Sequence, residues 1–469
     1  MRILIAISIL FLLHSCNGTK SSVHQNSTRI NLDSTIETSI KIGYNTANTF
    51  TYQEARKEEL FSTIEKIKPD LLRFPGGTIA NFYHPGNNNY GFKGTDTTQI
   101  VGNVSNHLKK LMSEDRGATE NYLERCIELC QQTKSSVLLV ANVLNGSIEE
   151  LESMISTLQE NKIEIEGIEL GNELYLKAYK KRIPNVEAYI DLCKPFAEYL
   201  KNAHPQIPIS VCIESRGDDS IASDDSWNAI LARESFFDAV AFHYYFRCGA
   251  CDQENENEKS ICFIENVQKE YSEQFVKTVD NLKNLFPNKP LWLTEFNLFE
   301  PGKNIGGTNA QAIILLEFTL RMYHSNKIEK IILHNIAGID KPFSGITITD
   351  DSITKNAWFN LYESILPKIE GYTPLYNEHA NKAGYSTYYY YNSKEKSVCR
   401  IIVNTANKPI ENIAPRFYYQ GKEQSSNMIR STEVNISDSL EKKSFSSIKS
   451  ITETSSTSYT VLMSIYSLN

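Results

Sequence analysis

This chain of 469 residues lacks a basic excess, metal-ligand spacings and an apolar run long enough to span a membrane. Acidic residues outnumber basic ones, 56 against 48, so no basic excess is left for binding nucleic acid. His and Asp do not recur at the spacings of metal ligands, so neither a resident metal nor another cofactor is expected. The N-terminal apolar run, residues 3–13, is too short to span a membrane. What remains is an ordinary globular composition with enough length for a large core.

The first fifteen residues have the shape of a secretory signal, in which Arg2 precedes the apolar run and Leu13-His14-Ser15-Cys16 follows it. That last segment resembles a bacterial lipoprotein box, which implies cleavage before Cys16 and lipidation of its thiol. We expect a signal peptide over 1–15 and a flexible polar tether over 16–37. The protein would then be an exported lipoprotein, in the periplasm or at the outer membrane or cell surface. A plain signal peptide is the alternative.

Three cysteines, Cys248, Cys251 and Cys262, lie close together in a polar segment that is expected to form a loop. With His243 as the only nearby His, they are a poor set of zinc ligands. Export would place them where disulfides persist. A disulfide that leaves one Cys over is therefore favoured, and the spacing does not decide which two pair.

Apolar, β-branched runs alternate with longer amphipathic segments between residues 38 and 367. This alternation is typical of a parallel α/β fold, and eight strand–helix pairs predict a (β/α)8 TIM barrel. In that fold the chemistry lies on the loops at the carboxyl ends of the strands. The predicted strands lie at 39–42, 71–74, 137–142, 167–170, 207–213, 239–243, 291–294 and 328–334.

The pattern changes in the last part of the chain, from residue 368 to residue 469. Short aromatic or alternating runs at 388–391, 398–403 and 459–465 are separated by polar residues and Pro. They predict an antiparallel β-sandwich of about a hundred residues. We expect this second domain to be accessory, because the candidate site residues all lie in the barrel.

Two carboxylates, Glu173 and Glu295, each follow a short apolar run. Cleavage of a glycosidic bond needs two such groups, one to protonate the leaving oxygen and one to meet the positive charge that develops on the sugar. Each acid alone has a structural explanation, in the first turn of a helix for Glu173 and on the surface for Glu295. Two acids at the strand ends of one barrel favour a glycosidase.

Polar residues at other strand ends supply partners for these acids. Arg73 ends the second strand, where its guanidinium could hold Glu295 ionised or could instead pair with the buried Glu169. His243 and Tyr245 end the sixth strand and would lie close to the sugar, although such a cluster is also common in cores.

Weaker candidates line the rest of the predicted mouth. Asn142, Glu214 and His334 end the third, fifth and eighth strands and are candidates for contacting substrate. A basic group just beyond Glu173 either recognises acidic groups on a polysaccharide or is a solvated helix face. Its members are Lys177, Lys180, Lys181 and Arg182.

The segments 72–78, 169–173 and 294–297 resemble the clan A glycoside hydrolases, nearest to their heparanase-like, arabinofuranosidase-like and xylosidase-like branches. The resemblance covers about residues 38–367, and a trailing sandwich is also typical of those branches. It implies that Glu173 is the general acid/base, that Asn172 binds the sugar 2-hydroxyl and that Glu295 is the nucleophile. It further implies that Arg73 supports Glu295 and that His243 or Tyr245 lies beside it.

One departure from the clan concerns the eighth strand, which ends in His334-Asn335 where the clan commonly has an aromatic residue, often Trp. The floor of the subsite for the cleaved sugar therefore differs. Segment 72–78 is similar to the arabinofuranosidase branch and segment 169–173 to the heparanase branch, so no single sugar follows.

We expect a retaining glycoside hydrolase that cleaves O-glycosidic bonds of a polysaccharide or oligosaccharide by double displacement. The expected partners are a carbohydrate substrate and, through Cys16, a membrane; nucleic acid is not expected. Two alternatives are a glycan-binding surface lipoprotein that keeps the barrel without catalysis and a metal-dependent hydrolase. The sugar, the linkage, endo or exo action and the oligomeric state stay open.

Overall fold

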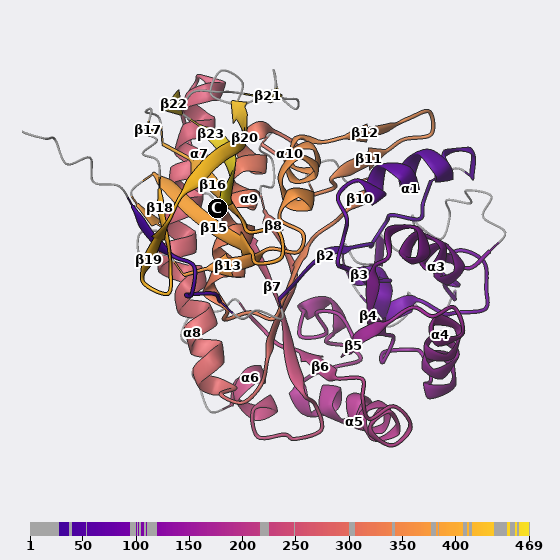
Figure 1. Ribbon diagram of the computed structural model, residues 1–469. Coiled ribbons are helices and arrows are strands. Elements are labelled where there is room, and N and C mark those ends of the chain that lie inside the picture. Colours follow the sequence, from indigo (N-terminus) through magenta and orange to yellow (C-terminus); the bar gives the residue numbers. More distant parts are fainter. Residues whose placement is uncertain are drawn as a thin grey trace, which may run out of the picture.

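The computed structural model shows a barrel followed by a sheet domain (Figure 1). The predicted signal peptide, Cys16 and Cys248 lie outside the described residues, so the lipid anchor stays a prediction. The structure describes residues 28–36, 40–52, 54–93, 100, 102, 105–106, 109, 120–215, 225–247, 249–299, 305–339, 343–376, 381–382, 384–406, 410–411, 415–435, 448–450, 455–456 and 459–468.

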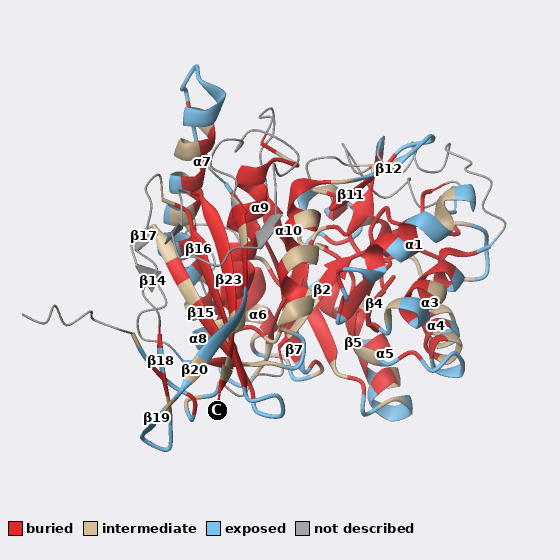
Figure 2. Cartoon of the chain, turned by 45° about the horizontal axis from the view of Figure 1, so that its top comes forward, coloured by how far each residue is buried: buried red, intermediate tan, exposed pale blue. Residues whose placement is uncertain are grey.

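Within these ranges, eight parallel strands close into a barrel in which β2 pairs with both β3 and β9. All eight predicted strands are present, which confirms the predicted TIM barrel. Figure 2 shows the labelled barrel strands β2, β4, β5 and β7 largely buried, because helices cover the outside and side chains fill the inside. The strands are β2 (Lys41–Asn45), β3 (Leu71–Phe74), β4 (Ser136–Ala141), β5 (Ile165–Leu170), β6 (Ile209–Cys212), β7 (Ala239–Phe246), β8 (Leu291–Leu298) and β9 (Lys330–Leu333).

Most of the helices around the barrel bury one apolar stripe against it, whereas α9 is buried on nearly every side. In the described part of the chain, none of them is both long enough and apolar enough to cross a membrane. They are α1 (Lys57–Glu65), α3 (Tyr122–Thr133), α4 (Ile148–Glu160), α5 (Val186–Ala203), α6 (Trp227–Leu231), α7 (Glu256–Glu270), α8 (Val276–Leu285), α9 (Asn309–Ser325) and α10 (Ala357–Ile365).

The interior of the barrel is apolar near the start of the strands and charged near their ends. A small buried cluster fills the lower part, made by Leu71, Leu138, Ala239, Trp292 and Ile332. Because side chains alternate along a strand, the residue two places further faces the same interior, so Arg73 lies above Leu71. Gly167 makes room for the indole ring of Trp292, since a Cβ atom there would lie 2.5 Å from it.

The second domain follows α10 and contains two larger sheets, together with a two-stranded pairing of β17 (Ile410–Glu411) with β22 (Ser455–Ser456). The two larger sheets confirm the predicted sandwich. The larger sheet contains β13 (Thr373–Leu375), β14 (Asn381–Lys382), β15 (Tyr385–Asn392), β16 (Ser397–Asn404), β20 (Ser426–Asn435), β21 (Ile448–Ser450) and β23 (Thr460–Leu468). The smaller sheet contains β1 (Arg29–Asn31), β18 (Arg416–Tyr419) and β19 (Lys422–Gln424).

The position of β1 corrects the predicted tether. Residues 29–31 fell inside the expected flexible segment, but they pair in parallel with β18 of the second domain. Ile30 and Leu32 are buried between the two sheets, beside Phe417 and Leu375. The prediction failed here because a strand of three residues with one buried side chain leaves no periodic signal among its polar neighbours.

Helix α9 joins the two domains. Its Glu317 is buried and accepts hydrogen bonds from Arg321 on the same helix, at 2.7 Å, and from the Tyr388 hydroxyl of β15, at 3.2 Å. Apolar side chains of α9 and of β15 belong to one continuous core. The sandwich therefore packs against the outside of the barrel, over α9.

A disulfide joins Cys251 to Cys262. The prediction of a disulfide in this segment is confirmed, although Cys262 lies in the first half of α7 and not in a loop. The bond ties the chain that leaves β7 to that helix. With two of the three sulfurs used in this way, the zinc interpretation of the cluster loses its ligands.

The correction to the tether can be tested by removing a buried side chain from β1. Ile30→Ala leaves a cavity between the sheets and is expected to lower the free energy of unfolding by about 2–5 kcal/mol. Urea unfolding of the whole chain measures it. Lys422→Ala, at an exposed position of β19, is the control and should change stability by no more than about 0.5 kcal/mol. If the two variants were equally stable, residues 29–31 would belong to the flexible tether and not to the folded second domain.

Candidate active site

Glu173 is presented by a sharp turn that follows β5. Gly171 and Glu173 both have positive φ angles, 82° and 48°, and a Cβ atom at Gly171 would lie 2.4 Å from Leu174. Asn81 holds the turn from the segment 78–82 by accepting a hydrogen bond from the Asn172 N–H, at 2.8 Å, and donating to the Asn172 carbonyl, at 2.7 Å. The acid at position 173 therefore depends on a backbone shape that the distant segment 78–82 stabilises.

Glu295 reaches the interior through an irregularity in β8. The pairing of β7 with β8 shifts between Phe242 and His243, so that His243 lies opposite Glu295 and Thr294 is the extra residue. Such a bulge re-aims neighbouring side chains. Thr294 and Glu295 consequently both face the polar end of the barrel, where Thr294 donates a hydrogen bond to Glu169 at 3.2 Å.

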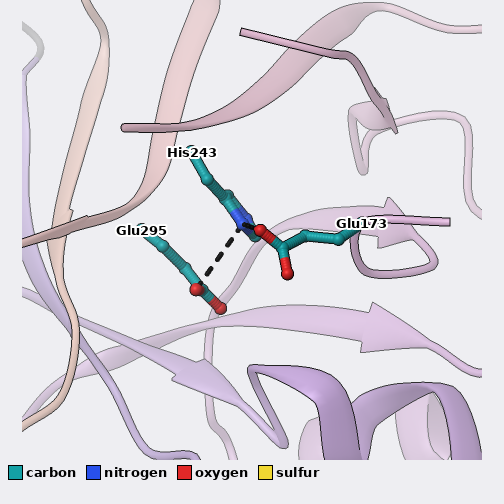
Figure 3. Close-up of side chains that lie close together, drawn as sticks. All are labelled: Glu173, His243 and Glu295. Atoms are coloured by element: carbon teal, nitrogen blue, oxygen red, sulfur yellow. Dashed lines mark hydrogen bonds and ion pairs between the residues drawn. The ribbon is translucent and has the colours of Figure 1, made fainter. Parts of the chain in front are cut away.

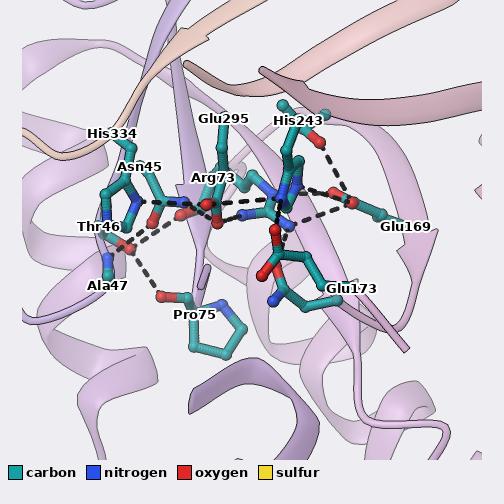
Figure 4. Close-up of polar contacts among 12 residues, drawn as sticks. Asn45, Thr46, Ala47, Arg73, Pro75, Glu169, Glu173, His243, Glu295 and His334 are labelled. Carbon is teal, nitrogen blue, oxygen red and sulfur yellow. Dashed lines mark hydrogen bonds and ion pairs between the residues drawn. The ribbon is translucent and has the colours of Figure 1, made fainter. Parts of the chain in front are cut away.

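Both oxygens of Glu295 are held by donors from other strands (Figure 4). Oε1 accepts hydrogen bonds from Asn45 at 3.0 Å and from Arg73 Nη1 at 2.7 Å, and Oε2 accepts one from the Tyr245 hydroxyl at 2.6 Å. The side chain is only 4% exposed. Three strands, β2, β3 and β7, thus determine where this carboxylate lies.

Arg73 is shared between two carboxylates. Its Nε and Nη2 atoms donate to the two oxygens of Glu169, at 2.8 and 3.1 Å, while Nη1 donates to Glu295. Nη2 also donates to the Asn172 side-chain oxygen at 2.8 Å. The two interpretations of Arg73 left open by the sequence are therefore both correct.

His243 lies between the two acids of the pair (Figure 3). Its Nδ1 atom is 2.9 Å from Glu173 Oε1 and 3.5 Å from Glu295 Oε2. One oxygen of each carboxylate and this nitrogen all lie within 4.8 Å of one another. Glu173 is the most exposed of the three, at 21% of its side chain, so it faces the solvent side of the site.

The charges of this cluster move two pKa values in opposite directions. Burial would raise the pKa of Glu295, but the positive charges of His243 and Arg73 and the hydrogen bond from Tyr245 hold it well below its usual 4.5. Burial would lower the pKa of His243, but the negative charges of Glu295 and Glu173 raise it above its usual 6.5. The site therefore keeps Glu295 ionised and favours a protonated His243.

A divalent cation is the other species that Glu173, His243 and Glu295 could hold, because together they offer three ligand atoms. One feature of the described residues argues against that use. Arg73 donates to Glu295 Oε1 at 2.7 Å, so a fixed positive charge already lies against this carboxylate.

The remaining predicted site residues lie in different places. His334 closes the site from β9, with Nδ1 3.7 Å from Glu295 Oε2. Asn142 does not join the cluster, because its amide donates to the Tyr83 carbonyl and accepts from the Asn145 N–H. Glu214 is tied through its backbone to Asn228. The basic group is exposed at Lys177, Lys180, Lys181 and Arg182, next to the turn that carries Glu173.

Asn45 is a site residue that the sequence interpretation missed. The predicted first strand ended at residue 42, three residues short of the end of β2, so the polar side chain at the strand end was not considered. A Tyr-Asn-Thr sequence after an apolar strand is the signal that could have identified it.

Solved structures with the same architecture span almost the whole chain. An α-L-arabinofuranosidase from Thermotoga maritima has 13% sequence identity and a TM-score of 0.66, and the match covers 94% of this chain and 99% of that one. A GH51 arabinofuranosidase from Xanthomonas axonopodis pv. citri has 14% identity, a TM-score of 0.66 and the same two coverages. The chain has the fold of these proteins.

A third structure is more distant. The GH30 endoxylanase from Clostridium papyrosolvens has 12% identity and a TM-score of 0.54, with 93% of this chain and 98% of that one covered. No protein-family profile matches the sequence, and no curated protein matches it. The likeness is therefore one of fold, including both domains.

The low pKa of Glu295 has a measurable effect on stability. Below pH 4.5 the unfolded chain takes up a proton at this position before the folded protein does, so the stability that the ionised carboxylate contributes is lost as the pH falls toward the folded pKa. The stability difference, which is the free energy of unfolding of the parent minus that of Glu295→Gln, should decrease as the pH is lowered from about 5.5 to about 3.5. Urea unfolding at each pH measures it, and a constant difference would contradict the low pKa.

Proposed function

We propose that the protein is a retaining glycoside hydrolase that cleaves O-glycosidic bonds of an oligosaccharide or polysaccharide, with Glu295 as nucleophile and Glu173 as general acid/base. The observation that carries the proposal is the spacing of their oxygens, which is within 4.8 Å. Retaining enzymes place the two carboxyl groups about 5–5.5 Å apart, whereas inverting enzymes leave about 6.5–9.5 Å for a water molecule. The glycosidases that share the fold support the assignment.

Glu295 has the properties of a nucleophile. Its pKa is held well below the usual value by charge, so it is ionised at neutral pH even though it is buried. In the first step a lone pair of Glu295 forms a bond to the anomeric carbon. The bond from that carbon to the leaving oxygen breaks, and its electron pair stays with the oxygen.

Glu173 supplies and recovers the proton. It protonates the leaving oxygen in the first step, and its partly exposed position suits a group that must meet both leaving group and water. In the second step it removes a proton from the water that attacks the anomeric carbon, and the bond electrons return to Glu295. The contact with His243 Nδ1 keeps the carboxyl group oriented toward the nucleophile.

Asn172 is suited to bind the 2-hydroxyl of the sugar. Arg73 can only donate hydrogen bonds, so the amide oxygen of Asn172 must face it. The amide nitrogen then points away from Arg73 with its two donors, and hydrogen bonds to a 2-hydroxyl that strengthen in the transition state are part of glycosidase design.

The alternative is a glycan-binding surface protein that uses the same barrel without catalysis. A binding protein gains nothing from burying an ionised Glu295 among three donors and a second acid, because that arrangement leaves less polar surface for sugar hydroxyls. The geometry therefore favours the enzyme, and turnover decides between them.

The stereochemistry of the product tests the mechanism. Proton NMR during hydrolysis of a panel of 4-nitrophenyl glycosides, arabinofuranosides and xylosides first, should show that the first-formed sugar keeps the anomeric configuration of the substrate. An inverted first product would overturn double displacement. Hydrolysis by Glu295→Gln at the rate of the parent would overturn the assignment of the nucleophile, and a parent that binds oligosaccharides without cleaving any of the panel would support the binding protein.

The role of Glu173 predicts a dependence on the leaving group. Glu173→Ala should lower kcat about 10²–10⁴-fold for a substrate whose leaving group needs a proton. For a 2,4-dinitrophenyl glycoside, whose leaving group needs none, formation of the glycosyl-enzyme should be nearly unaffected, and added azide should restore turnover. Glu187→Ala, at an exposed acid of α5, is the control. Equal losses with both leaving groups would remove Glu173 from this role.

A further inference from the structure

Glu169 is the one member of the carboxylate cluster to which the reaction above gives no task. It is fully buried and accepts two hydrogen bonds from Arg73, at 2.8 and 3.1 Å, so it binds the guanidinium with both oxygens. Thr294 donates to it as well, and His243 Nε2 lies 3.9 Å from Oε1. Arg73 is also fully buried, and the two carboxylates together raise its pKa. The guanidinium thus stays charged in a place without solvent.

The reaction removes one of the two anions that Arg73 faces. When Glu295 bonds to the anomeric carbon, its carboxylate becomes a neutral ester and its negative charge is lost. A buried cation that loses its anionic partner is strongly destabilised. Glu169 does not take part in the bond changes, so its charge is the same before and after the step.

We infer that Glu169 is a positioning residue that keeps Arg73 paired while Glu295 is esterified. This inference rests on the proposed function. With Glu169 ionised, the guanidinium keeps two of its hydrogen bonds to an anion in the glycosyl-enzyme, and only the third donor, Nη1, faces the ester. Without that charge, Glu295 would be the one anion that Arg73 contacts, which would stabilise the free carboxylate and destabilise the ester.

The two half-reactions should therefore respond differently to Glu169→Gln. Formation of the glycosyl-enzyme should slow by about 10–100-fold, which corresponds to one or two buried charge-assisted hydrogen bonds, whereas its hydrolysis should keep its rate or become faster. A residue that only supports the fold would slow both half-reactions together. The readout is the rate of glycosyl-enzyme formation divided by the rate of its hydrolysis, and Glu169→Gln should lower this ratio.

One probe measures both rates on the whole chain. A 2-deoxy-2-fluoro glycoside with a 2,4-dinitrophenyl leaving group, built on the sugar found by the substrate panel, labels the enzyme at the rate of the first half-reaction. Recovery of activity after removal of the probe gives the rate of the second, and mass spectrometry of peptides locates the label. A label on another residue, or no label, would overturn the proposed function. A label on Glu295 with an unchanged ratio in Glu169→Gln would overturn only the role of Glu169.

Thr294→Val is the matched control, because it removes a hydrogen bond to Glu169 while both charges stay. It should change the two rates by the same factor, and a ratio shifted as far as in Glu169→Gln would show that packing, not charge, is responsible. If Glu169→Gln does not fold, Glu169→Asp carries the test. Its carboxylate lies one methylene further from Arg73, so the ratio should fall in the same direction by a smaller factor, and an unchanged ratio overturns the inference.

Discussion

The guanidinium of Arg73, buried between Glu169 and Glu295, is the interaction on which the site depends. It joins β3, β5 and β8 through ionic hydrogen bonds, and through the Asn172 amide it also reaches the turn that carries Glu173. A buried cation needs anionic partners with good geometry, and here each of the three nitrogens of Arg73 donates to a carboxylate. The same contacts that keep Arg73 paired hold Glu295 ionised, so the stability of the barrel's polar end and its chemistry come from one arrangement.

The barrel can contain this polar end because its interior is divided into two parts. Apolar side chains near the start of the strands, with Trp292 packed over Gly167, form a closed floor. One strand period further, the interior positions carry charged and amide groups that meet only one another and the solvent side. Two local irregularities complete the site: the bulge that makes Thr294 and Glu295 both face inward, and the turn with positive φ angles at Gly171 and Glu173. The backbone is irregular at both acids, and functional sites are the places where such departures from regular structure are expected.

The elements of the barrel and the identity of its acids could be predicted from sequence, because each rests on a local pattern. Apolar runs gave all eight strands, and a carboxylate directly after such a run marked Glu173 and Glu295. The same reasoning stopped short at Asn45, because the first strand is short and contains Gly43 and Tyr44, which blur its apolar pattern. It failed for β1, which forms only because β18 offers it an edge. Asn142 was selected by the same rule as Arg73, yet its amide is used by the Tyr83 carbonyl and by the Asn145 N–H of its own loop.

The amino-acid sequence by itself determined the alternation of strands and helices, the aromatic sandwich that follows, and the placement of an acid at the ends of two strands. Those features depend on residues near one another in the chain, because the apolar residues of a strand or helix repeat at a spacing that can be recognised in the sequence. Tertiary structure alone decided which partners each acid has. Arg73 and Glu295 are 222 positions apart, and His243 meets Glu173 across 70. No spacing in the chain encodes such a contact, because closing the barrel, and not the local sequence, sets which strand ends face each other.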